Sequence, residues 1–162
     1  GKLLLNYPIN HKSQRTTGLI QLSQKEDWRA KHWQAIQTTY GSAPFFEAVA
    51  HDLKAVFQNQ KLQSLWEFNM ALIKVVFSWL RVSPPLHLTS EWQAEPQGMT
   101  DFRQSFHPKK PAPVRHFPAY PQVFDEKYGF RPNLSIIDLV FNEGPAAYDY
   151  LLALDLDAGG EI

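Results

Sequence analysis

Apolar residues recur at intervals of three and four along most of this chain, and they predict three long helices. The first follows Ser23, which has the form of a capping box with Glu26, and it ends at Gly41, a residue suited to the left-handed conformation of many helix C-termini. The second covers residues 44–58 and opens with a proline. The third covers residues 62–82 and is apolar around most of its circumference, which is typical of a central, buried helix.

This third helix is predicted to carry the core. Trp66 and Ile73 lie on its main apolar face, so replacing either with alanine is expected to cost about 2–5 kcal/mol through cavity formation. Asn69 lies on the same face, and a buried amide needs hydrogen-bond partners. We expect its side chain to bond to backbone groups of the corner at residues 40–44, where a tight turn leaves polar groups in need of partners.

Two shorter helices are predicted near the C-terminus. Ser135 and Asp138 have the spacing of a second capping box, and an apolar run follows them to Phe141. Residues 142–144 end that helix, and Pro145 opens the next one. The spacing therefore assigns Asp138 to a cap.

The N-terminal part predicts a little sheet. Residues 2–9 alternate weakly and residues 19–22 form a second short apolar run, so both predict strands that pair antiparallel. Residues 83–132 hold nine of the twelve prolines and predict a long irregular loop. The predicted fold class is α+β, a small N-terminal sheet packed against a mostly helical bulk with a long Pro-rich loop. The length suits a single domain over residues 1–162.

Composition excludes several kinds of site and partner. The chain has no cysteine, so it forms no disulfide, thiolate zinc site or cysteine nucleophile, and we predict a cytoplasmic protein. Its histidines show no HxH, HxxxH or HExxH spacing, so no metal site is predicted. No window resembles a membrane span or a signal peptide. The net charge is zero, which argues against a nucleic-acid partner.

The first candidate site residues are Arg29 and His32. They lie three positions apart and so share a side of the first helix. Arg29 could hold a phosphate or carboxylate, with His32 as general acid or base. The alternative is a solvated arginine beside a histidine packed between Trp28 and Trp33.

A second group of candidates lies in the Pro-rich loop. Loops on a rigid scaffold are where ligand contacts concentrate, and a cationic loop suits a diphosphate or a sugar nucleotide. The alternative is a solubilising surface loop. The candidate binding residues there are Arg103, His107, Lys109 and Lys110.

The third group lies between the last two helices. Glu143 could point into a cleft as a general base, with Asn142 beside it as a binding residue. Equally, Glu143 could cap the last helix, because its charge is favourable at a helix N-terminus. The chain contains no GxGxxG, P-loop or GxSxG motif, so its sequence identifies no cofactor.

Four segments of the chain together resemble one bacterial family. They read W-R-x-K-H-W at residues 28–33, Y-G-S-A-P-F-F-E at residues 40–47, L-x-x-F-N-x-A-L-I at residues 65–73, and Y-P-Q-V-F…G-F-R-P-N-L-S-I-I-D-L-V-F-N-E-G-P at residues 120–145. In this order they are similar to the WbqC-like family, which is associated with the biosynthesis of bacterial surface polysaccharide of the O-antigen type.

The resemblance implies two functions. One is a transferase that acts on a small phosphorylated or nucleotide sugar, and the other is a binding or assembly protein of the same pathway without chemistry of its own. It also implies that about one more βα-rich segment, with a His-containing motif, precedes residue 1 in the full family domain. Neither the residues nor the resemblance indicates an oligomeric state.

Overall fold

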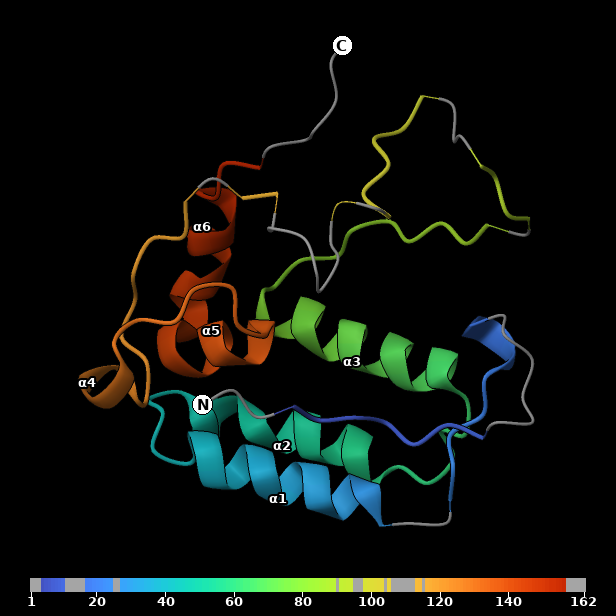
Figure 1. Ribbon diagram of the computed structural model, residues 1–162, viewed down its shortest axis with the longest axis horizontal. Coiled ribbons are helices and arrows are strands. Elements are labelled where there is room, and N and C mark those ends of the chain that lie inside the picture. The colour runs from blue at the N-terminus through green and yellow to red at the C-terminus, as the bar shows by residue number, and fades with distance from the viewer. Residues whose placement is uncertain are drawn as a thin grey trace.

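The computed structural model describes residues 4–10, 17–24, 27–89, 91–94, 98–103, 105, 113–114 and 116–156. This part of the chain is helical (Figure 1). Its elements are, in order, η1 (Thr17–Leu19), α1 (Trp28–Tyr40), α2 (Phe46–Gln58), α3 (Leu65–Trp79), α4 (Asp125–Tyr128), α5 (Ile136–Glu143), η2 (Gly144–Ala146) and α6 (Ala147–Leu152).

The three predicted long helices are confirmed as α1, α2 and α3. Helix α2 packs against both α1 and α3, and α5 packs against α2 and α3 at one end of this arrangement (Figure 1). Helix α6 follows α5 through the η2 turn and packs back against α5. Residues 116–124, near the end of the Pro-rich stretch, form hydrogen bonds with α5 and α6. Because α2 and α3 also pack against α5, segments from both halves of the chain meet around this helix.

The start of α1 differs from the prediction. Its cap is Asp27, whose carboxylate accepts a hydrogen bond from the backbone N–H of Ala30 at 3.3 Å. Ser23 instead offers its backbone carbonyl to the indole N–H of Trp28 at 3.1 Å, so its predicted role as the cap is wrong. Glu26, the other half of the predicted capping box, lies outside the described residues.

Gly41 ends α1 for a reason other than the predicted one. Its φ is −59°, an ordinary right-handed helical value. A Cβ at this position would lie 2.8 Å from the backbone oxygen of Gln37, closer than a side chain tolerates. Close approach rather than left-handed geometry therefore favours glycine here. The backbone N–H of Phe45, just beyond the corner, donates to the carbonyl of Phe141 at 3.0 Å and ties the corner to α5.

The predicted N-terminal sheet is wrong, because the described residues contain no strand. In the N-terminal part, antiparallel pairing is limited to single bridges between Ile9 and Leu22 and between Gln21 and Ser64. Pro8 cannot donate a ladder hydrogen bond. The apolar residues of these segments, such as Tyr7 and Leu22, pack on the helices instead of on one another. The fold class of the described chain is therefore mainly α-helical rather than α+β.

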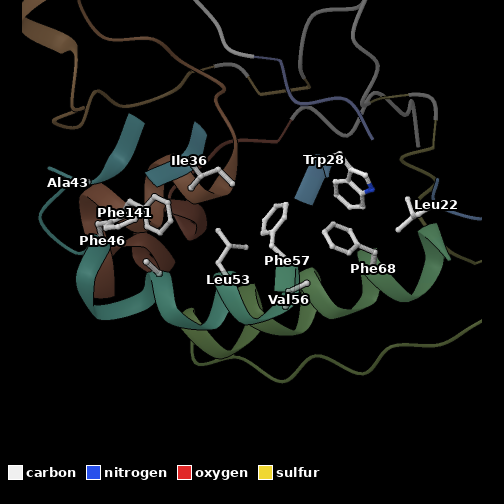
Figure 2. Packing of buried hydrophobic residues seen from close by; sticks show 11 residues of the cluster. Leu22, Trp28, Ile36, Ala43, Phe46, Leu53, Val56, Phe57, Phe68 and Phe141 are labelled. Atoms are coloured by element: carbon white, nitrogen blue, oxygen red, sulfur yellow. The ribbon is translucent and has the colours of Figure 1, made fainter. Parts of the chain in front are cut away.

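The core has two aromatic parts, which Figure 2 shows from close by. Trp28, Phe57 and Phe68 point toward one another at one end of the helices, with ring centroids 5.3–5.5 Å apart for the pairs that involve Phe68. Phe46 and Phe141 meet at the other end, at 5.1 Å. Aromatic pairs at these distances are attractive beyond the area that they bury.

Helix α3 does not play the role that its apolar sequence predicts. Trp66 is 37% exposed and Ile73 is 39% exposed, whereas Phe68 on another face of the helix is fully buried. Because α3 lies on one side of α2 rather than at the centre, only part of its circumference is covered in the described structure. The prediction that Trp66→Ala or Ile73→Ala costs about 2–5 kcal/mol is therefore wrong, because it was made for residues that are partly exposed.

The expectation for Asn69 is also wrong. Its side chain is only partly buried, and among the described residues it forms no hydrogen bond to the corner at residues 40–44. Local backbone bonds, from Ala43 to the Tyr40 carbonyl at 2.9 Å and from Phe46 to the Ala43 carbonyl at 3.1 Å, satisfy part of that corner. The bond from Phe45 to α5 supplies the long-range link that was expected from Asn69.

Candidate functional site

The described structure contains a groove of about 850 Å³. Helices α1, α2 and α3 contribute to its wall, residues 4–7 border it, and residues 122–138 supply the rest. Most of its surface is apolar, as is common in small-molecule sites. The apolar lining includes Leu4, Leu5, Ile36, Leu53, Phe57, Leu72, Val76, Val123, Leu134, Ile136 and Ile137.

One wall of this groove carries a buried carboxylate. Asp138 lies in the first turn of α5 and is only 3% exposed. Its carboxylate accepts hydrogen bonds from the hydroxyl of Tyr120 at 2.7 Å and from the side-chain amide of Gln122 at 2.9 Å. The hydroxyl of Tyr40 lies beside the same carboxylate and interacts with it. We call Tyr40, Tyr120, Gln122 and Asp138 the Asp138 network.

The tyrosines of the network stay protonated at neutral pH. Burial, together with the neighbouring Asp138 carboxylate, raises the pKa of Tyr40. Burial and the hydrogen bond to Asp138 likewise raise the pKa of Tyr120. Both phenols therefore act as hydrogen-bond donors to Asp138 and not as bases.

Gln122 holds the network to the loop beyond it. Its side chain donates to the carbonyl of Arg131 at 3.0 Å and accepts from the backbone N–H of the same residue at 2.8 Å. Its own backbone N–H donates to the carboxylate of Asp125 at 3.1 Å. These bonds fix residues 122–131 as one border of the groove.

Two cationic side chains lie on that border. Lys127 and Arg131 both line the groove and are exposed to solvent. A carboxylate takes about four hydrogen bonds, and the side chains of Tyr120 and Gln122 supply two to Asp138. The groove therefore offers an acceptor position for a ligand hydroxyl and two cations for ligand oxyanions.

The structure places Arg29 and His32 outside the groove, in the aromatic core. Arg29 is 4% exposed and His32 is 8% exposed, so the solvated arginine that the sequence allowed is not found. His32 packs against Tyr7, Trp28 and Phe57 rather than between two tryptophans. Burial lowers the pKa of His32, an effect that its hydrogen bond to the backbone of Asn6 partly opposes.

Arg103 is the described member of the predicted loop cluster, and it is engaged within the loop. Its guanidinium pairs with Asp101 at 2.6 Å and donates to the backbone carbonyls of Gln93 at 2.7 Å and Ala94 at 3.0 Å. It does not line the groove. The other three members, His107, Lys109 and Lys110, lie outside the described residues.

Glu143 and Asn142 end α5, away from the groove lining. Asn142 is buried, and its amide donates to the backbone carbonyl of Asp138 at 2.7 Å. Glu143 precedes η2 without a side-chain capping bond. A smaller cavity of about 420 Å³ lies beside Gly144, but neither Glu143 nor Arg103 is part of its lining.

The residues of the Asp138 network were not predicted as a site. Ser135 makes no side-chain capping bond, and Asp138 points into the network instead of completing a capping box. The available signal was an aspartate inside the apolar run I-I-D-L-V-F at residues 136–141. Its partners Tyr120 and Gln122 lie 18 and 16 positions earlier, beyond the range of local spacing rules.

Two further properties bear on function. No helix in the described part of the chain has the length and hydropathy needed to cross a membrane. Within the same residues, no three His, Asp or Glu side chains gather closely enough to hold a metal ion.

Comparison with known proteins places the chain among relatives. The model of the WbqC-like protein family matches residues 1–107 and 111–150. A protein of Mycobacterium tuberculosis (strain ATCC 25618 / H37Rv), described as the uncharacterized protein Rv1507c, is 27% identical over 151 residues. That match covers 77% of this chain and 64% of the relative, so the chain spans less than two thirds of the relative's length. No solved structure matches the chain. Because the family model covers most of its residues, the chain belongs to the WbqC-like protein family.

Proposed function

We propose that the groove binds a phosphorylated sugar or a nucleotide sugar, and that the protein is a transferase for precursors of bacterial surface polysaccharide. The observation that carries this proposal is a buried carboxylate, Asp138, on the wall of a groove of about 850 Å³. That volume lies within the range of cavities that bind small molecules. The association of the WbqC-like family with surface polysaccharide, which the sequence resemblance implies, favours a substrate from polysaccharide assembly.

Three charged groups of the groove would have partners in such a ligand. A sugar presents hydroxyl groups, which donate to the acceptor position left on Asp138. Its phosphates would be met by Lys127 and Arg131, because Arg forms bidentate bonds with phosphate and Lys supplies a point charge. A nucleobase or a sugar ring fits against the apolar wall. Asn142 supports this arrangement indirectly, by bonding to the carbonyl of Asp138.

The second candidate function is a binding protein that performs no transfer. The observation that favours it is the same carboxylate. The hydroxyl of Tyr120 and the side-chain amide of Gln122 already donate to the Asp138 carboxylate, so these hydrogen bonds hold it as a fixed group on the groove wall. In this function Asp138 recognises a ligand hydroxyl without accepting its proton.

A thermal-shift screen tests whether the groove binds this class of ligand. We expect a nucleotide sugar at 100 times its dissociation constant to add about 2.7 kcal/mol to stability, or roughly 5–10 °C in Tm. UDP-glucose, UDP-N-acetylglucosamine, dTDP-glucose and glucose 1-phosphate form a first panel. The double variant Lys127→Ala/Arg131→Ala should lose most of the shift, because both side chains line the groove.

Lys74→Ala is the matched control, since Lys74 is an exposed cation of α3 outside the groove lining. It should keep the full shift. A wild-type protein that no member of the panel stabilises, or a double variant that responds fully, would contradict the proposal. Release of free nucleotide from the best ligand, measured with candidate acceptor sugars, separates the transferase from the binding protein.

A further inference from the structure

Arg29 is held rigidly inside the aromatic core. One of its terminal nitrogens, Nη2, donates to the backbone carbonyl of Leu62, which lies between α2 and α3. The centre of the guanidinium lies 4.7 Å from the Trp28 ring and 5.1 Å from the Phe68 ring. Two aromatic contacts and one hydrogen bond therefore fix the position of a side chain that is normally mobile and hydrated.

Two other donor atoms of Arg29 lack a hydrogen-bond partner in the described structure. Its Nε and Nη1 atoms are buried and have no hydrogen-bond partner among the described residues. No carboxylate in that part of the chain forms an ion pair with it. Burial lowers the pKa of Arg29, but a guanidinium still keeps its proton at physiological pH. A positive charge therefore remains buried without a counter-charge, which is costly.

His32 adds a second unsatisfied atom on the same side of α1. Its Nδ1 is buried and has no partner among the described residues, while its other nitrogen is the one that can bond to the backbone of Asn6. The His32 ring lies 5.3 Å from the Trp28 ring, whose other neighbours include the Arg29 guanidinium. Buried polar atoms in native proteins almost always have partners, so two such groups around one tryptophan indicate an absent ligand.

We propose that Arg29 is the anchor of a buried oxyanion-binding site, separate from the groove, which takes a phosphate or carboxylate group of a small molecule. Arg29 does not line the groove, so this site does not depend on the function proposed for the groove. Its position in the first turn of α1 also favours an anion, since the helix dipole is positive there. Asp27 accepts from the N–H of Ala30 through its carboxylate and from the N–H of Lys31 through its carbonyl.

We expect the anion to enter past irregular segments rather than between packed helices. Leu62 belongs to the connection between α2 and α3, and Asn6 belongs to the extended N-terminal segment. The antiparallel pairing described for the N-terminal segment is a single bridge at Ile9. The N-terminal segment is also held by backbone bonds from Asn10 to the Gln21 carbonyl and from Ser23 to the Pro8 carbonyl, and short irregular segments of this kind open more easily than packed helices.

The test is the response of Tm to inorganic phosphate and, in a separate arm, to acetate, both against chloride at constant ionic strength. The wild-type protein should gain several degrees with at least one of the two anions, and the arm that responds identifies the anion class. Arg29→Met should fold, because it replaces an unpaired buried charge with an apolar side chain of similar length. We expect its response to that anion to be at least tenfold weaker in apparent affinity.

The variant Lys127→Met/Arg131→Met removes the cations of the groove, so it should keep the part of the anion response that Arg29→Met loses. A second measurement needs no variant that might alter folding: the Arg29 Nε–H resonance should shift saturably as the anion is added. A wild-type protein that responds to neither anion, an unmoved Nε–H resonance, or a response lost in the groove variant instead of Arg29→Met would overturn the proposal.

Discussion

Replacing Phe68 with alanine should destabilise the protein by about 3–5 kcal/mol, the largest effect that we expect from a core truncation. Phe68 is fully buried, and its ring lies 5.3 Å from Trp28, 5.4 Å from Tyr7 and 5.5 Å from Phe57. Its removal leaves a cavity between these rings and removes one of the two aromatic rings that contact the Arg29 guanidinium. Chemical denaturation followed by far-UV circular dichroism measures the loss.

Trp66→Ala is the matched control on the same helix. Trp66 is 37% exposed, so its truncation loses less buried surface and leaves no closed cavity. We expect a cost of about 1 kcal/mol or less, within the range of surface substitutions and mild core losses. If Trp66→Ala were as damaging as Phe68→Ala, the assignment of the core to the Phe68 side of α3 would be wrong.

The second large effect is expected at Gly144, where alanine should cost about 2–5 kcal/mol. This residue has φ 52° and ψ −121°, a conformation that side chains other than glycine rarely adopt. A Cβ there would also lie 2.5 Å from the ring of Phe45. Because the backbone N–H of Phe45 also donates to α5, movement of its ring disturbs the link between the α1–α2 corner and α5.

Gly129→Ala separates the two causes. Gly129 has φ 67° and ψ 171°, which is also strained for alanine, but a Cβ added there would meet no atom within 4 Å. Its cost should therefore reflect backbone strain alone, about 1–3 kcal/mol. Thermal unfolding of both variants gives the comparison. A Gly144→Ala protein that is no less stable than Gly129→Ala would show that Phe45 moves aside freely.

The local sequence pattern predicted the three long helices correctly and the N-terminal sheet incorrectly. Caps and apolar spacing are properties of neighbouring residues, and α1, α2 and α3 follow them closely, although the α1 cap is Asp27 rather than Ser23. The short N-terminal runs are ambiguous on their own. Whether they form strands depends on whether they pair with each other or pack on helices that lie far away in sequence. Tyr7 packs against Trp28 and Phe68, and that tertiary choice cannot be read from alternation.

The candidate site shows the same limit. Arg29 and His32 were predicted from helical spacing, which places them on one side of α1, but spacing did not reveal that both would be buried. Asp138 was assigned to a cap because its distance from Ser135 in sequence fits a capping box. Its actual partners come from Tyr40 and from residues 120–122, which only the folded chain brings together.

The groove beside Asp138 is the proposed ligand site, and the proposed function depends on it. The most direct test is an amide ¹⁵N–¹H NMR titration of the wild-type protein with the nucleotide sugar that gives the largest thermal shift. We expect saturable shifts concentrated at Tyr40, Lys127, Arg131 and Asp138, all of which line the groove. Shifts that avoid these four residues, or that never saturate, would contradict the assignment of the groove as the ligand site.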